Sequence, residues 1–323
     1  MQSKSLLDMF ILKMSPNSAF LPDEYHDGMY HYTSSSGFDS ILFNNKNVIN
    51  FWASRYNCLN DYSEGKIVLP VYTQACEELL QDGLITKEVY ELVIGIKQAN
   101  THLLHLSKNG TVKFKRYECD RYICSFSKNR DSLSMWNYYS KDNKYEGYNI
   151  GIDSKNTKDI LVKYFSDKLV NVAIYPVVYN REEQKKYIKK MLLQINKNYS
   201  KEHETSIRCF VSTLLLEWNL LFKSDYFQHE EEVRIIIDVA KLLSVTKEKA
   251  DFYSNIRYRK NYGLIIPYIE IEIGKDSLIS TTIGPLRFDD SQKELQKQIM
   301  NEQLIKNGYG IIDIAFSKIP IRY

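Results

Sequence analysis

The stretch His229-Glu230-Glu231-Glu232-Val233-Arg234-Ile235-Ile236-Ile237 decides most of what the sequence predicts. Val233 and the three isoleucines are β-branched, which predicts a strand that is buried on at least one face. Side chains alternate along a strand, so Glu230, Glu232 and Arg234 are expected to share one face. Charges are rarely buried unless they are paired. This face is therefore either solvated or the wall of a polar cleft, and the stretch alone leaves both interpretations open.

Composition is that of an ordinary globular protein. The chain has 323 residues, of which 44% are hydrophobic and 26% are charged, enough for one large domain or two modest ones. A formal net charge of +3 is too small to indicate a nucleic-acid or membrane partner by itself. The 25 tyrosines are more informative, because tyrosine suits half-buried walls and stacking sites.

The thiols and the N-terminus indicate a cytoplasmic protein. The chain has five cysteines, an odd number, and none are spaced as C-x-x-C. This pattern is typical of reduced thiols. His102 and His105 lie three residues apart on an expected helix. No second pair of metal ligands follows them, which favours two surface histidines over a metal site. Charged residues interrupt the apolar run in residues 1–20, which is too short for a membrane span. The cysteines are Cys58, Cys76, Cys119, Cys124 and Cys209.

The order of the expected elements predicts an α+β fold, formed as a single mixed domain over residues 1–323. Strands gather early and late in the chain, and the middle is helical. Strands are expected at 29–33, 48–53, 122–126, 148–153, 170–179, 233–239, 264–273, 280–283 and 311–316. Helices are expected at 38–43, 66–108, 134–140, 181–196, 206–222 and 291–305.

The earliest strand carries a candidate functional histidine. It reads Tyr30-His31-Tyr32-Thr33-Ser34. A lone histidine on a strand is more often structural than catalytic. Here Tyr30, Tyr32 and Thr33 surround His31 with hydrogen-bonding groups, which can hold its ring in one tautomer.

Two further polar or aromatic motifs have an ordinary structural explanation and a functional one. Residues 60–64, Asn-Asp-Tyr-Ser-Glu, read as a turn followed by a helix cap. The run 135–139, Met-Trp-Asn-Tyr-Tyr, places Met135 and Tyr139 on one helix face. Such an aromatic set is usually core, and otherwise it is the stacking wall of a nucleotide pocket. The sequence has no G-x-G-x-x-G, P-loop or H-E-x-x-H motif.

Taken in order, these motifs resemble a bacterial family, the domain of unknown function 2971. Members carry H-Y-T-S, N-D-x-x-E, C/S-F-S, M-W-x-x-Y, G-x-x-I-G-I, E-x-E-x-R and I-G-P. The resemblance covers residues 29–322, and the family brings no settled activity. The matching segments here are His31–Ser34, Asn60–Glu64, Ser125–Ser127, Met135–Tyr139, Gly147–Ile152, Glu230–Arg234 and Ile283–Pro285, closed by Ile319–Arg322.

A more distant resemblance, to the ADP-ribosyltransferase fold, implies a chemistry. It makes His31 the ribose-binding residue, Glu232 the catalytic glutamate and Glu230 the acceptor-side glutamate of arginine-modifying members. The second strand departs from that pattern, because residues 50–54 lack the Ser-Thr-Ser of those members. Tyr56 is the candidate stacking residue. The other cofactor-binding candidates are Tyr32, Thr33, Ser54, Trp136, Tyr139 and Arg234.

The substrate that this resemblance implies is NAD. Cleaving the nicotinamide–ribose bond passes through an oxocarbenium-like transition state, which a fixed carboxylate such as Glu232 stabilises. Arg234 can orient that carboxylate or hold the pyrophosphate. Glu230 can deprotonate a nucleophile if its neighbour raises its pKa. Glu231, on the opposite face, is expected to be a bystander.

Three hypotheses follow. The first is an NAD-consuming enzyme, an ADP-ribosyltransferase or NAD glycohydrolase of the kind found among toxins and phage-defence effectors, with a protein or nucleic acid as acceptor. It requires His31 and Glu232 to face one cleft. The second is a non-enzymatic nucleotide- or protein-binding module using Trp136, Tyr139 and Arg234. The third is a metal-dependent nuclease, although the near-neutral charge disfavours it. Its metal ligands would be Asp61, Glu64, Glu230 and Glu232. No membrane partner is expected, and the oligomeric state stays open.

Overall fold

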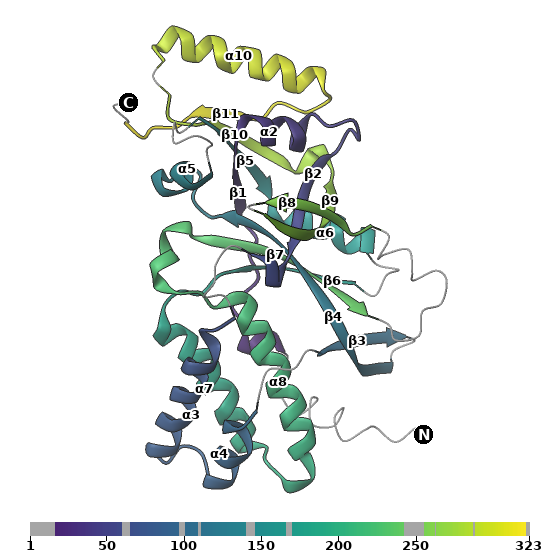
Figure 1. Cartoon of the computed structure of the whole chain (residues 1–323), viewed down its shortest axis with the longest axis vertical. Coiled ribbons are helices and arrows are strands. Elements are labelled where there is room, and N and C mark those ends of the chain that lie inside the picture. The colour runs from purple at the N-terminus through teal and green to yellow at the C-terminus, as the bar shows by residue number, and fades with distance from the viewer. Residues whose placement is uncertain are drawn as a thin grey trace.

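The computed structural model combines helices with one 11-stranded sheet, which confirms the predicted mixture of helices and strands (Figure 1). It describes residues 17–59, 65–96, 101–108, 111–139, 146–165, 170–241, 255–261, 263–286 and 288–320. A layer of helices lies at one end of the sheet and α10 lies at the other.

The sheet is built around β4. Its main path runs β11-β10-β5-β1-β4-β2-β9-β8, while β7 pairs with β4 and β6, and β3 pairs with β4. Pairings are antiparallel except for β10 with β11. The strands are β1 (Gly28–Thr33), β2 (Ile49–Arg55), β3 (Thr101–Lys108), β4 (Thr111–Ser127), β5 (Tyr148–Asp153), β6 (Val170–Pro176), β7 (Glu232–Lys241), β8 (Arg257–Asn261), β9 (Leu264–Ile273), β10 (Leu278–Ile283) and β11 (Asp313–Phe316).

Side-chain caps fix where several helices begin. Asp289 accepts from the backbone N–H of Gln292 in a capping box, and Thr86 and Asn180 cap α4 and α7. The α-helices are α2 (Ser35–Leu42), α3 (Val68–Gln81), α4 (Lys87–Ile94), α5 (Leu133–Tyr139), α6 (Ser154–Phe165), α7 (Arg181–Lys197), α8 (Glu204–Leu221) and α10 (Asp290–Lys306). The short 3-10 helices are η1 (Asn17–Phe20), η2 (Tyr56–Cys58), η4 (Lys201–His203), η5 (Asp225–Glu230) and η7 (Lys275–Ser277).

The prediction of one long helix over 66–108 is wrong in its last part. The chain forms α3 and α4 and then the strand β3, which pairs with β4 along its whole length. His102 and His105 therefore lie on a strand rather than a helix. The apolar spacing of this segment fits either period, and pairing with β4 satisfies its backbone groups. The helix α6 and the strand β8 were not expected at all.

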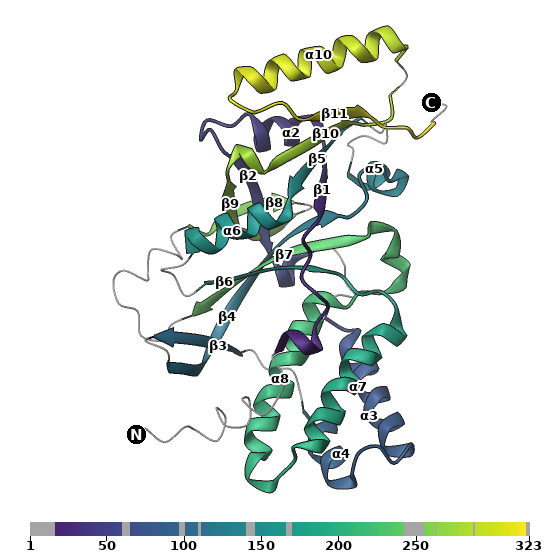
Figure 2. The same cartoon turned by 180° about the vertical axis from the view of Figure 1, so that it is seen from behind.

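The decisive strand, β7, is buried on both faces. Ile236 packs into a core shared with α3, α4, α7 and α8. Val233, Ile235 and Ile237 point the other way, into a core that includes side chains of α2, α6 and α10. Figure 2 shows α6 lying across the sheet on the side away from the helical layer. Residues on β7 thus connect the two larger hydrophobic cores of the described chain.

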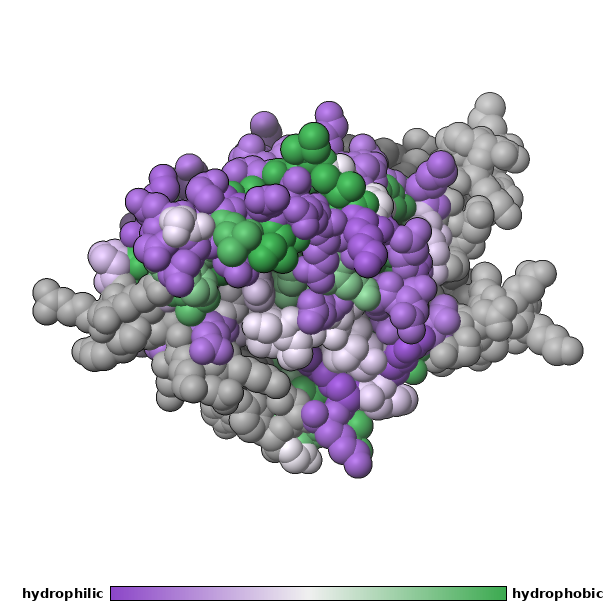
Figure 3. Space-filling view, turned by 90° about the horizontal axis from the view of Figure 1, so that it is seen from above, coloured by the Kyte–Doolittle hydropathy of each residue, from purple (hydrophilic) through white to green (hydrophobic). Residues whose placement is uncertain are grey.

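The outer surface at the α10 end is mostly hydrophilic, with apolar side chains in small patches (Figure 3). On α10, Met300 and Leu304 are buried against the sheet, while Leu295 and Ile299 are exposed. None of the helices in the described ranges combines the length and apolar character that a membrane crossing needs.

Ile236 should be the main apolar contact of β7 with the helical layer. Replacing it with alanine removes three buried methyl and methylene groups from an almost fully buried side chain. We expect Ile236→Ala to lower the free energy of unfolding by about 2–5 kcal/mol, measured by urea denaturation. Ile265→Ala, on exposed β9 surface, is the matched control and should cost less than about 0.5 kcal/mol. Equal losses from both variants would contradict this role.

Candidate active site

A cavity lies where β1 and β2 separate along one edge of β4. Tyr30 of β1 pairs with Ser127, and Ser54 of β2 pairs with Ile123. Between these points, residues 124–126 of β4 pair with β7 on the opposite edge. The gap between β1 and β2 opens into a cavity of about 480 Å³, within the usual size range of small-molecule sites.

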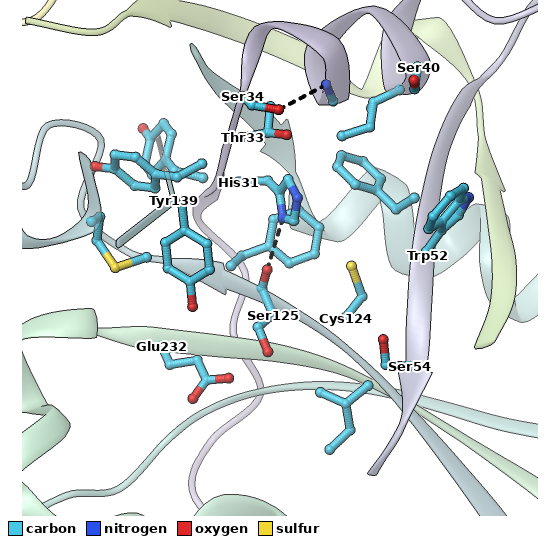
Figure 4. A pocket seen from close by; sticks show the side chains of 18 of the residues that line it. His31, Thr33, Ser34, Ser40, Trp52, Ser54, Cys124, Ser125, Tyr139 and Glu232 are labelled. Carbon is cyan, nitrogen blue, oxygen red and sulfur yellow. Dashed lines mark hydrogen bonds between the residues drawn. The ribbon is translucent and has the colours of Figure 1, made fainter. Parts of the chain in front are cut away.

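Most of the sequence-predicted site residues line this cavity. His31 and Glu232 are far apart in the sequence, but both line this cavity, as the first hypothesis requires. Figure 4 shows His31 above Ser125, with Glu232 to one side and Trp52 and Ser54 to the other. The predicted residues that line the cavity are His31, Tyr32, Thr33, Ser54, Tyr139, Glu230 and Glu232.

His31 is held in one tautomer. Its Nδ1 lies 3.1 Å from the carbonyl oxygen of Ser125. A carbonyl only accepts, so Nδ1 carries the proton and Nε2 is left as an acceptor. The rings of Phe51 and Phe126 meet the imidazole edge to face, with centroids 5.1 and 5.5 Å away. Burial lowers the pKa of His31 below its ordinary value despite the Ser125 bond, which keeps the ring neutral near pH 7.

Glu232 is a buried, oriented anion. The Nε and one terminal nitrogen of Arg234 donate to its two carboxylate oxygens, each at 2.8 Å, and Lys223 Nζ lies 3.2 Å away. Its backbone N–H donates to the Tyr179 hydroxyl at 2.9 Å. Burial raises the pKa of the Glu232 carboxyl, but Arg234 and Lys223 outweigh it and hold the pKa at about 2. Glu232 is therefore ionised at neutral pH.

Glu230 comes from a different element than the one expected. It ends η5 rather than lying on β7, because Glu231 takes a left-handed conformation with φ of 45° and breaks the strand alternation. Glu230 still lines the cavity, and its carboxylate accepts from Lys223 at 2.6 Å. The carboxylate of Glu231 accepts from Asn129 instead and is not part of the cavity wall, as its expected bystander role requires.

Three predicted binding residues do not line the cavity. Arg234 lies behind Glu232, where it also donates to the carbonyl of Leu220 at 2.8 Å, so it orients the carboxylate and does not reach a ligand. Trp136 is buried behind Tyr32, and its indole N–H donates to Asp131. Tyr56, expected to be the stacking residue, packs against the core of the helical layer.

Several residues that were not predicted as site residues also line the cavity. Asn50 and Trp52 share a face of β2 with Ser54, and strand alternation from Ser54 would have found them. Cys124 also lines the cavity, and burial raises the pKa of its thiol to about 12 despite the nearby Arg259, which excludes a thiolate nucleophile at neutral pH. Arg259 comes from β8, a strand with no clear sequence signal.

The nuclease hypothesis gains no support from the geometry. Over the described ranges, no group of three or more His, Cys, Asp or Glu residues is placed to hold a metal ion. The carboxylates of Glu230 and Glu232 are already bound by Lys223 and Arg234. The other two proposed ligands, Asp61 and Glu64, belong to the motif at 60–64, which lies outside the described residues.

Comparison with known proteins supports the family resemblance over part of the chain. A family model described as "Protein of unknown function (DUF2971)" matches residues 135–235. This confirms the predicted relationship for the segment from α5 to the first half of β7, which contains Tyr139, Glu230 and Glu232. His31 and β2 lie outside the matched range. No curated protein and no solved structure matches the chain.

The buried Glu232 carboxylate should make stability depend on pH in acid. Its pKa is about 2 in the folded protein and about 4.3 in the unfolded chain, so its stabilising effect is complete above about pH 4.3 and is lost as the pH falls towards 2. The total loss should be about 3 kcal/mol. Glu232→Gln cannot titrate, so its deficit in unfolding free energy relative to wild type should shrink between pH 6 and pH 3 in urea titrations. A constant deficit would contradict this.

Proposed function

We propose that the protein is an NAD-consuming enzyme with an ADP-ribosyltransferase-like site, acting as a transferase or as an NAD glycohydrolase. The observation that supports this most is that His31 and Glu232 line one cavity, at the point where β1 and β2 diverge from β4. The resemblance on which the proposal rests requires an early strand histidine and a late strand glutamate to face each other across a ribose.

The neutral His31 suits the binding of a ribose. Its Nδ1 proton is committed to the Ser125 carbonyl, so its Nε2 can accept a hydrogen bond from a ribose hydroxyl. The surrounding Phe51 and Phe126 rings fix the plane of the imidazole. A positioned acceptor of this kind fixes the orientation of the sugar before any bond is broken.

The two glutamates suit the breaking of the glycosidic bond. Both carboxylates line the cavity, whereas Lys223 and Arg234 do not, so a ligand meets negative charge first and the balancing cations behind it. As the bond between C1′ and nicotinamide breaks, its electron pair leaves with nicotinamide and positive charge develops on the ribose ring. The ionised Glu232 stabilises that charge without having to reorganise, because Arg234 already fixes its orientation.

Glu230 is placed to complete the reaction. A nucleophile, either water or a group on an acceptor, forms a bond to C1′ and must lose a proton. The Glu230 carboxylate is somewhat more accessible than that of Glu232, with side-chain exposures of 14% and 6%. It can accept this proton, which makes Glu230 the general base and Glu232 the electrostatic residue.

Nicotinamide release from NAD tests the proposal. Purified wild-type protein incubated with NAD should release nicotinamide, measured by liquid chromatography, with labelled NAD added to a cell lysate to detect transfer. Glu232→Gln should lower kcat by about 10²–10³-fold. Glu231→Gln, one residue away but outside the cavity, is the matched control and should keep wild-type activity. Thermal melting of each variant verifies folding.

Two outcomes would overturn the proposal. If neither nicotinamide release nor transfer occurs with wild-type protein, the chain is not an NAD-consuming enzyme, and NAD binding without turnover would support the binding-module hypothesis instead. If Glu231→Gln and Glu232→Gln lose activity equally, the assignment of Glu232 fails even though an activity exists.

A further inference from the structure

One cation in the cavity wall lacks an anionic partner. The charged side chains that line the cavity are Glu230, Glu232 and Arg259. The two glutamates are balanced by Lys223 and Arg234. Within the described ranges Arg259 forms no ion pair with a carboxylate, so its charge is available to an anionic group of a ligand.

The guanidinium of Arg259 is nevertheless held in place. One terminal nitrogen donates to the Ser54 hydroxyl at 2.9 Å, and the guanidinium carbon lies 6.0 Å from the centre of the Trp52 ring. Its Nε is buried and has no hydrogen-bond partner in the described part of the chain. A buried N–H without a partner is costly, so packing alone does not explain why the guanidinium is held here.

The neighbouring Arg257 shows what an ordinary surface arginine on the same strand looks like. Its side chain is 55% exposed, it pairs with Glu270 at 3.1 Å and it does not line the cavity. Arg259, by contrast, lines the cavity and donates to Ser54, a residue that is itself buried. The surroundings of Arg259 are therefore not those of an ordinary surface arginine.

The charges are separated along the cavity. Glu232 lies on the side formed by β7, and Ser54 and Trp52 lie on the side formed by β2, with His31 and Ser125 between them (Figure 4). Arg259 joins the β2 side through its bond to Ser54. One end of the cavity thus favours positive charge and the other favours negative charge.

We propose that Arg259 and Ser54 form the phosphate-binding end of the cavity, so that the ligand is a phosphorylated nucleotide with its phosphates against Arg259. The planar fork of an arginine matches two phosphate oxygens, and the Ser54 hydroxyl can donate to a third. Trp52, which is 43% exposed and stacked on Tyr268 at 4.5 Å, supplies an aromatic surface beside these phosphates. Identifying the nucleotide as NAD rests on the proposed function, and the phosphate contact does not.

Isothermal titration calorimetry with ADP and adenosine tests the phosphate contact. Wild-type protein should bind ADP at least about tenfold more tightly than adenosine, a preference of the size expected for one charge-assisted contact. Arg259→Gln should remove this preference by weakening ADP binding while leaving adenosine binding unchanged. Arg257→Gln is the matched control, and it should keep the wild-type preference. Added salt should weaken the binding of ADP more than that of adenosine.

The outcomes separate this inference from the proposed function. Equal affinity of wild type for ADP and adenosine, no binding of either, or an ADP preference that survives Arg259→Gln in a folded variant would each overturn the phosphate site. An ADP preference that depends on Arg259, in a protein that releases no nicotinamide from NAD, would uphold the phosphate site and overturn the enzymatic proposal.

Discussion

The buried ion pair between Glu232 and Arg234 is the interaction on which the rest of the structure depends. Arg234 is 2% exposed, binds both oxygens of Glu232 and also donates to the carbonyl of Leu220 near the end of α8. A cation at a helix C-terminus is favourable. One guanidinium therefore fastens the helical layer to β7 and at the same time fixes the carboxylate that lines the cavity. Removing one partner of such a pair leaves an uncompensated buried charge, which typically costs about 3–5 kcal/mol.

The position of the cavity follows from how β4 is shared. Near the end of β4, β2 pairs with Tyr122 and Ile123 and β1 pairs with Ser127, and neither strand pairs with the residues between. The carbonyl of Ser125 lies in this gap, and His31 satisfies it with a ring N–H. The same gap therefore creates the space for a ligand and orients the histidine. β7, on the opposite edge of β4, brings Glu232 to the cavity, and η5 just before it brings Glu230.

Charge is distributed so that the two ends of the cavity differ. At the β7 end, carboxylates face the cavity and their cations stand behind them. At the β2 end, Arg259 faces the cavity beside Ser54. A ligand that carries phosphates at one end and develops positive charge at the other matches this distribution, as NAD does during loss of nicotinamide. The two proposals thus describe the same ligand from its two ends, although each can fail separately.

Local sequence determined the strand at 232–241, the strand bearing His31 and the family resemblance, because each depends on residue types and spacing within a short segment. The resemblance to the ADP-ribosyltransferase fold selected His31 and Glu232 as a pair. Only the tertiary structure decided which side chains reach the cavity. Arg234 turns towards α8, Tyr56 packs into the helical layer, and Arg259 enters from β8 through the pairing of β2, β9 and β8. Those placements depend on contacts between segments distant in the chain, and a one-residue change of conformation at Glu231 alone redirects Glu230. No local pattern encodes such contacts.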